Sequence, residues 1–116
     1  MPERMRRINE SVRRVLSEAV GQLKDPRIGF VTVTGVKVTA DLGRAWVFYT
    51  ALGDDKERAA TRAGLRSATP YLRASIGKQV RLKFLPELEF EEDVSLEHAA
   101  RIDRLIEELH AEDAGA

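Results

Sequence analysis

The sequence has no cysteine among its 116 residues, which excludes disulfides and thiolate metal sites. No apolar run approaches the roughly 20 residues that a membrane span needs, and the basic N-terminus lacks the apolar core of a secretory signal. The patterns G-x-S-x-G, P-loop and G-x-G-x-x-G are also absent, so the common signatures of acyl transfer and nucleotide binding are missing. We therefore expect one cytoplasmic domain that is not an enzyme and carries no cofactor.

The formal net charge is zero, but the charges are distributed unevenly along the chain. Residues 1–50 contain nine Lys and Arg against five Asp and Glu, a balance of +4. Residues 51–85 contain eight against three, a balance of +5, whereas residues 86–116 contain two against eleven, a balance of −9. The chain is thus basic over its first 85 residues and acidic afterwards, which its mean charge conceals.

Hydrophobic periodicity predicts a helix and a β-hairpin in the first half of the chain. Apolar residues recur at helical spacing over residues 3–24, and the pair Asp25-Pro26 ends this pattern. Residues 29–39 then alternate with period two, and the phase slips at Gly35, as it does at a β-bulge. A second strand is predicted over residues 45–51 after a short turn, and the short connection predicts antiparallel pairing.

The middle of the chain predicts two consecutive helices with a break between them. A capping-box spacing at Asp54 begins a helix that runs to about Ser67. Thr69 is a predicted N-cap with Pro70 at the first helical position, so a second, short helix is expected to start there. Gly77 is predicted to end that helix.

A third strand and a C-terminal helix complete the predicted order. Residues 80–84 alternate as a strand, and the alternation continues beyond Pro86 to Phe90. The apolar side chains predicted to point inward are Val80, Leu82, Phe84, Leu88 and Phe90. Ser95 is expected to cap a last amphipathic helix, and residues 111–116 are expected to form a flexible tail. The order α-β-β-α-α-β with a C-terminal helix indicates a small α+β domain.

Neither the histidines nor the acidic run predicts a metal site. His98 and His110 lie twelve residues apart on the predicted C-terminal helix, too far for a ligand pair. The acidic run over residues 89–97 could hold a hard cation through its carboxylates. Its strand alternation indicates a solvated face instead, so we expect no metal.

The segment between Glu57 and Glu87 carries basic residues and no acidic one. Its predicted nucleic-acid contacts are Arg58, Arg62, Arg66, Arg73, Lys78, Arg81 and Lys83. The first three recur every four residues and form one stripe on a helix. Such a surface can track phosphates, because each neutralised phosphate releases counterions. The alternative is a solvated basic face that has no partner.

The chain resembles the ribosome-binding factor A family in segments that follow one another over nearly its whole length. These segments are KDPRIG (24–29), VTVTGVKVTADLGRAWVFYT (31–50), GLRSATPYLRASIGKQVRLKFLPELEF (64–90) and DVSLEHAARIDRLI (93–106). KDPRIG and RLKFLPELEF are the most specific of them. Because the matches keep their order, the resemblance is more specific than any single motif.

The resemblance implies a type II KH-like fold over residues 1–110, in which helices cover one face of a three-stranded mixed sheet. It also implies a non-enzymatic assembly factor that binds the immature small (30S) ribosomal subunit and its 16S rRNA. Such a factor would assist late maturation and rRNA processing, notably in the cold. Ribosomal proteins and assembly GTPases would be further partners, and the free protein would be a monomer that does not contact membranes.

The resemblance also locates a predicted RNA-binding site. KH domains clamp the nucleic-acid backbone with a G-x-x-G loop between two helices. This family is expected to have an Ala-x-Gly kink there, and the aligned residues are Ala68, Thr69 and Pro70. Proline lacks an N–H and has a fixed φ, so we interpret this corner as a rigid bend that aims the neighbouring cations. The predicted RNA-binding surface combines the seven cations above with Arg6, Arg13, Lys24 and Arg27.

Two other functions are compatible with the same sequence. One is a general KH-type RNA-binding protein or RNA chaperone that acts on other RNAs. The other is a protein-interaction module, in which the acidic C-terminal part docks on a basic ribosomal protein or on the protein's own basic face.

Overall fold

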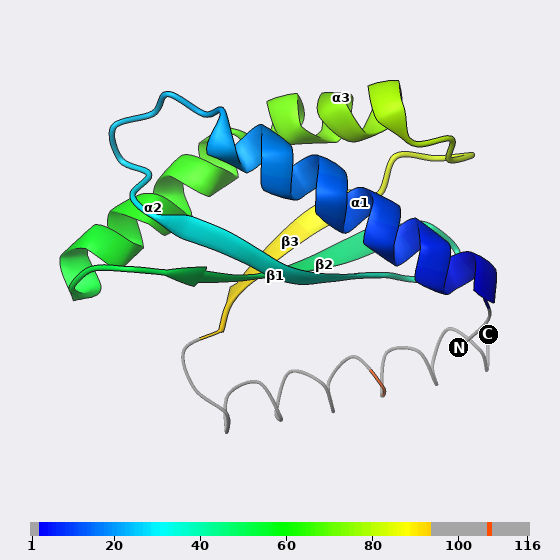
Figure 1. Cartoon of the computed structure of the whole chain (residues 1–116), viewed down its shortest axis with the longest axis horizontal. Coiled ribbons are helices and arrows are strands. Elements are labelled where there is room, and N and C mark those ends of the chain that lie inside the picture. The colour runs from blue at the N-terminus through cyan, green and yellow to red at the C-terminus, as the bar shows by residue number, and fades with distance from the viewer. Residues whose placement is uncertain (1–2, 94–106, 108–116) are drawn as a thin grey trace.

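The computed structural model describes residues 3–93 and residue 107. Three helices and three strands follow one another in the order α-β-β-α-α-β (Figure 1). Their bounds are α1 Glu3–Gly21, β1 Val31–Val38, β2 Arg44–Ala51, α2 Asp55–Ser67, α3 Thr69–Gln79 and β3 Glu87–Glu92. The predicted N-cap Ser95, its helix apart from residue 107, the two histidines and the predicted tail at residues 111–116 lie outside the described residues.

The three strands form one mixed sheet in the order β1-β2-β3. β1 and β2 pair antiparallel, as expected from the short turn between them, and β2 and β3 pair parallel. A parallel pair needs a long crossover connection, which α2 and α3 supply. All three helices lie on the same face of the sheet (Figure 1). The predicted α+β fold with a three-stranded mixed sheet is therefore confirmed.

The predicted β-bulge lies where the phase of the sequence slips. The pairing register of β1 against β2 shifts between Val33 and Gly35, so Val33 opposes Tyr49 and Gly35 opposes Phe48. After the shift, Val36 turns to the buried face that Val33 occupies before it. The apolar residues have odd numbers before the bulge and even numbers after it. The bulge therefore keeps them all on one face of the sheet.

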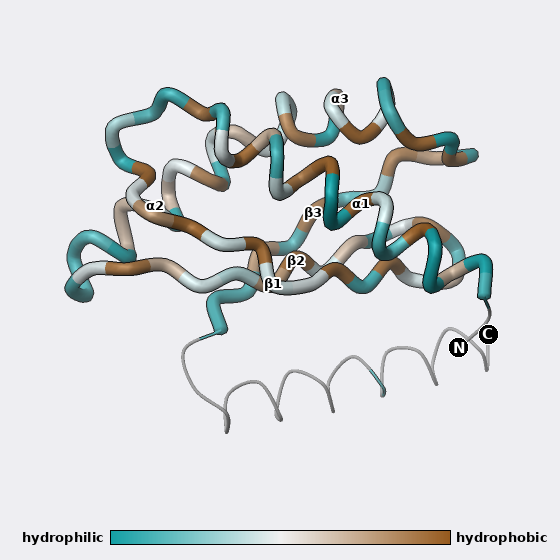
Figure 2. Tube along the Cα trace, in the orientation of Figure 1, coloured by the Kyte–Doolittle hydropathy of each residue, from teal (hydrophilic) through white to brown (hydrophobic). Residues whose placement is uncertain are grey.

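The core lies between that face of the sheet and the helices. α1 contributes its apolar stripe, and hydrophobic and hydrophilic segments alternate along this helix in Figure 2. α2 contributes Leu65, and α3 contributes Leu72 and Ile76. Fully burying one such side chain stabilises the fold by about 1.5–3 kcal/mol. The buried members of the core are Val12, Val15, Leu16, Ala19, Val20, Val33, Val36, Val38, Leu42, Ala45, Val47, Tyr49, Leu65, Leu72, Ile76 and Leu88.

The prediction of a strand over residues 80–84 is wrong. β2 begins at Arg44, which is the partner of Glu87 at the start of β3. Among the described residues, the segment before Glu87 therefore has no strand beside it, and it forms an irregular connection. Phe84, predicted to point inward, is 57% exposed. Beyond Pro86 the predicted alternation holds, because Leu88 is buried and Phe90 packs against the core.

Three predicted helix boundaries are also wrong. α1 ends at Gly21, whereas its pattern predicted about residue 24. α3 continues past Gly77 to Gln79, because this glycine serves close packing and not a turn. A Cβ on Gly77 would lie 3.3 Å from Leu85 Cδ2, which is tighter than ordinary contact. The N-cap of α3 is Ala68, since the hydroxyl of Thr69 donates back to the Leu65 carbonyl.

Candidate nucleic-acid interface

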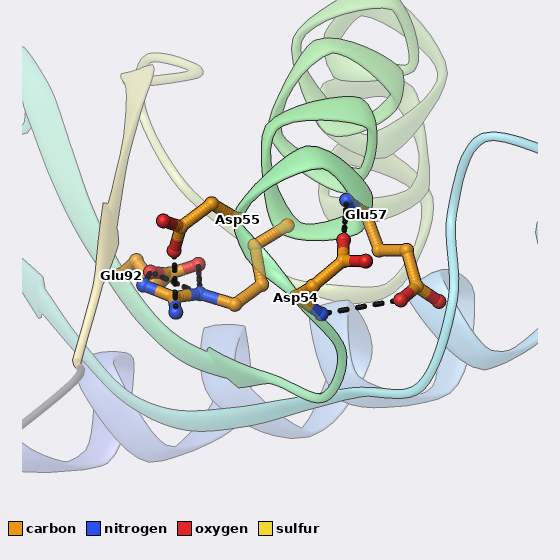
Figure 3. A network of polar contacts seen from close by, with 5 residues as sticks. Asp54, Asp55, Glu57 and Glu92 are labelled. Carbon is orange, nitrogen blue, oxygen red and sulfur yellow. Dashed lines mark hydrogen bonds and ion pairs between the residues drawn. The ribbon is translucent and has the colours of Figure 1, made fainter.

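A side-chain cap at Asp54 fixes the start of α2. The Asp54 side chain accepts from the backbone N–H of Glu57 at 2.8 Å, and the Asp54 N–H donates to the Glu57 carboxylate at 3.2 Å (Figure 3). This reciprocal pair is the predicted capping box, and it satisfies backbone groups that a helix start leaves open. The helix then presents Arg58, Arg62 and Arg66 at successive turns.

Arg58 is engaged within the protein. Its guanidinium donates to the Glu92 carboxylate at 2.9 and 3.2 Å, and it also contacts Asp55 at 3.4 Å (Figure 3). The Glu92 side chain is only 10% exposed, because it follows Leu88 and Phe90 on the inward face of β3. The hydrogen bonds that Arg58 donates to the Glu92 carboxylate raise the pKa of Arg58. This pair ties α2 to β3 and leaves Arg58 little capacity for phosphate.

Arg73 is also engaged within the protein. Its Nε donates to the Pro86 carbonyl at 3.0 Å, and its Nη2 donates to the Leu85 carbonyl at 2.9 Å. The same guanidinium lies 3.6 Å from the Glu87 carboxylate. Arg73 therefore holds the connection that leads from α3 into β3.

The other five cations of the segment are exposed, and none forms an ion pair with residues 3–93 or 107. We call them the free cations, and they are Arg62, Arg66, Lys78, Arg81 and Lys83. Arg62 lies beside the Tyr49 hydroxyl, where it opposes the rise in the Tyr49 pKa that burial causes. The Lys83 ammonium lies 5.6 Å from the centre of the Phe84 ring.

The four cations predicted outside this segment differ in their surroundings. Arg6 pairs with Glu3 at 2.8 Å, and Arg13 pairs with Glu10 at 2.6 Å, both along α1. Arg27 pairs with Asp25 at 2.7 Å, and its hydrogen bonds lower the pKa of that carboxyl. These three pairs are solvent-accessible, so a phosphate could compete for each guanidinium.

Lys24 is exposed and has no ion pair within the described part of the chain. It lies in the loop that joins α1 to β1, which packs on α2. The backbone N–H of Gly29 donates to the Thr61 hydroxyl at 3.2 Å. A Cβ on Gly64 would lie 2.5 Å from Ile28 Cγ1, so only glycine fits this contact without movement. The Thr61 hydroxyl also donates to the Arg27 carbonyl at 3.5 Å, so the packing brings Arg27 to the flank of α2.

The corner between α2 and α3 is tight, as the sequence predicted. Ala68 is both the C-cap of α2 and the N-cap of α3, with φ −82° and ψ −4°. Thr69 is half-buried, and Pro70 is exposed in the first turn of α3. The Ala68 N–H donates to the Gly64 carbonyl at 3.0 Å, so it is not free to bind a ligand. A direct RNA contact at this corner stays a prediction.

Sequence reasoning missed three residues that shape this region. Glu92 neutralises Arg58, Thr61 docks the loop before β1, and Phe84 is exposed beside cations. The parity of Glu92 with Leu88 and Phe90 was a readable signal, since it marks an inward carboxylate that needs a partner. Nothing local in the sequence distinguishes Thr61 or Phe84.

Neither a candidate metal site nor a candidate membrane-spanning helix is found in the described part of the chain. No group of three or more potential metal ligands occurs among residues 3–93 and 107. Within the same residues, no helix combines the length and the apolar character that crossing a membrane requires.

Comparison with known proteins gives consistent matches over most of the chain. The family model described as ribosome-binding factor A matches residues 4–106. The ribosome-binding factor A of Geobacter sulfurreducens is 49% identical over 113 residues, which cover 97% of this chain and 96% of that protein. The crystal structure of ribosome-binding factor A from Thermus thermophilus is similar with a TM-score of 0.67 and 31% identity, over 76% of this chain and 94% of that one.

A further similar structure concerns a complex. It is a homology model of the Thermus thermophilus ribosome binding factor A, fitted into a cryo-EM map of a complex of that factor with 30S. Its TM-score is 0.59 at 32% identity, and the match covers 72% of this chain and 88% of that one.

Proposed function

Since the chain belongs to the ribosome-binding factor A family, we propose that it binds the small ribosomal subunit through the basic surface along α2, α3 and the connection after them. The relative that was fitted into a map of a 30S complex supports this partner. The ligand would be 16S rRNA, whose phosphates attract cations and release counterions on binding. The protein would act as an assembly factor without catalysis.

The free cations are the observation that carries this proposal. Within residues 3–93 they have no carboxylate partner, although acidic side chains are abundant on the neighbouring strand β3. The two arginines of the same segment that do meet β3, Arg58 and Arg73, fix the scaffold. The positive charge of the free cations is therefore available to an anionic partner.

Charge reversal on this surface tests the proposal. We expect Arg66→Glu and Lys78→Glu each to weaken binding to purified small subunits about 10- to 150-fold, because a charge-assisted hydrogen bond contributes about 1.5–3 kcal/mol. Arg14→Glu is the matched control, since Arg14 is exposed on α1 outside the predicted surface. Dissociation constants from fluorescence anisotropy with labelled protein provide the measurement. Equal losses in all three variants would contradict the assignment of the surface.

A competition experiment separates an assembly factor from a general RNA binder. We expect unlabelled intact small subunits to displace the labelled protein from subunits at lower concentration than naked RNA of the same length does. Equal competition would favour the general KH-type RNA binder. Displacement by ribosomal proteins alone would favour a protein-interaction module.

We further propose that binding assists late maturation of the small subunit and processing of its rRNA, in the cytoplasm and notably during growth in the cold. The family membership supports this role. Deletion of the gene should then cause unprocessed 16S rRNA to accumulate, more at low than at high growth temperature. An rRNA profile that does not change at either temperature would contradict it.

A further inference from the structure

Phe84 is an exposed aromatic side chain without an obvious role in the fold. It is 57% exposed, and it lies in the connection between α3 and β3, outside the buried core. An exposed phenylalanine gains little from folding, because most of its apolar surface stays in water. The residues around Phe84 therefore indicate which ligand the ring could bind.

The backbone around Phe84 is held firmly on both sides. Before it, Leu82 packs against the core. After it, Arg73 donates to the carbonyls of Leu85 and Pro86, and the Leu85 side chain packs closely against Gly77. Pro86 itself is fully buried. The connection thus presents the ring on an anchored backbone, which lowers the entropic cost of binding a partner there.

The surroundings of Phe84 are cationic. The Lys83 ammonium lies 5.6 Å from the ring centre, within the range of a cation–π contact. Arg81 and Lys78 are exposed nearby in the chain, and Lys78 directly follows the glycine that Leu85 contacts. The nearest carboxylate along the chain, Glu87, lies beside Arg73 at 3.6 Å. A ligand at the ring would therefore meet apolar surface flanked by positive charge.

We propose that Phe84 stacks on an unpaired base of RNA while Lys78, Arg81 and Lys83 bind the adjoining phosphates. An aromatic ring among cations is the combination that single-stranded nucleic acid requires, because each nucleotide offers a flat base and an anionic phosphate. Stacking tolerates any base, since each has a π-face. The proposal rests on the proposed function, because it names the RNA element that the same basic surface takes.

The test measures how Phe84→Leu and Phe84→Tyr bind to two oligomers. One is an oligoadenylate, and the other has the same phosphates but abasic riboses. Phe84→Leu removes the ring and keeps an apolar side chain, whereas Phe84→Tyr keeps the ring. We expect Phe84→Leu to weaken oligoadenylate binding about 5- to 150-fold, and to leave binding to the abasic oligomer within about twofold. Phe84→Tyr should bind both oligomers as the wild type does.

Phe30→Leu is the matched control. Phe30 is 80% exposed and directly precedes β1 in the chain. The start of β1 lies at the opposite end of the molecule from the connection between α3 and β3 (Figure 1). This variant should bind oligoadenylate like the wild type. An equal loss in Phe30→Leu and Phe84→Leu would overturn the proposal.

The remaining outcomes separate this proposal from the proposed function. A wild type that binds small subunits but does not prefer oligoadenylate over the abasic oligomer overturns the stacking site alone. A Phe84→Leu variant that loses affinity for subunits but not for oligoadenylate assigns Phe84 to a protein contact, and also overturns it. A wild type that does not bind small subunits at all contradicts the proposed function instead.

Discussion

At the scale of single residues, the ion pair of Arg58 with Glu92 couples α2 to the edge strand β3. The Glu92 carboxylate is 10% exposed and accepts from the guanidinium at 2.9 Å. A carboxylate removed from water destabilises the protein strongly when its partner is lost. The pair therefore belongs to the scaffold that carries the basic surface.

Arg58→Met is expected to lower the melting temperature by several degrees, because it leaves the Glu92 carboxylate unpaired. Arg66→Met should change the melting temperature little, since Arg66 lies on the same helix, is exposed and has no ion pair in the described part of the chain. Thermal unfolding followed by circular dichroism provides the measurement. Equal melting temperatures for the two variants would show that the pair contributes nothing to stability.

Asp41 gives the protein an acid-sensitive turn. The hydrogen bond from the Thr39 hydroxyl at 2.7 Å, then that from the Gly43 N–H at 2.8 Å, lower the pKa of Asp41. Because the folded pKa is depressed, its stabilising contribution is complete above the ordinary value of about 3.9 and is lost as the pH falls through the folded pKa.

Asp41→Asn is therefore expected to reduce the dependence of the unfolding free energy on pH below about pH 4. Urea unfolding at a series of acidic pH values measures this dependence. Glu18→Gln is the control, since Glu18 is exposed on α1 without an ion pair among the described residues. If Asp41→Asn and the wild type lose stability in parallel as the pH falls, the Asp41 turn is not the source of the acid sensitivity.

At the scale of elements, local signals predicted the fold where the cause itself is local. The bulge at Gly35 and the capping box at Asp54 depend on neighbours a few residues away, and both are confirmed. The strand expected over residues 80–84 failed because pairing depends on β2, which begins at Arg44. Alternation shows that a segment could form a strand, but not that another strand lies beside it.

The same distinction applies to the candidate site. The sequence gives the position of each cation but not its partner, so Arg58 and Arg73 looked equivalent to Arg66. Their partners, Glu92 and the carbonyls of residues 85 and 86, are distant in the chain and meet them only in the fold. The binding role of the free cations stays a prediction.

The docking of the loop before β1 on α2 provides a test at this scale. Gly64→Ala should destabilise the protein by about 1–3 kcal/mol, because the new Cβ would lie 2.5 Å from Ile28 Cγ1. Gly21→Ala is the matched control, since a Cβ there meets nothing within 4 Å. We expect Gly21→Ala to stabilise by about 0.4–1 kcal/mol in urea unfolding. Equal gains from both substitutions would contradict the tight packing.

At the scale of the whole molecule, the zero net charge conceals two uses of the basic residues. Part of the positive charge holds the acidic strand β3 against the helices, through Arg58 and Arg73. The remainder is exposed along α2, α3 and the connection that follows. We propose that residues 1–110 present this remainder as one RNA-binding domain.

The most direct test of this account is the salt dependence of binding to the small subunit. The logarithm of the association constant should fall linearly with the logarithm of the salt concentration. Arg66→Gln should reduce the magnitude of that slope by about one, as expected when one phosphate contact is lost. Binding that is indifferent to salt, or a slope that Arg66→Gln leaves unchanged, would contradict the assignment of the basic surface to rRNA.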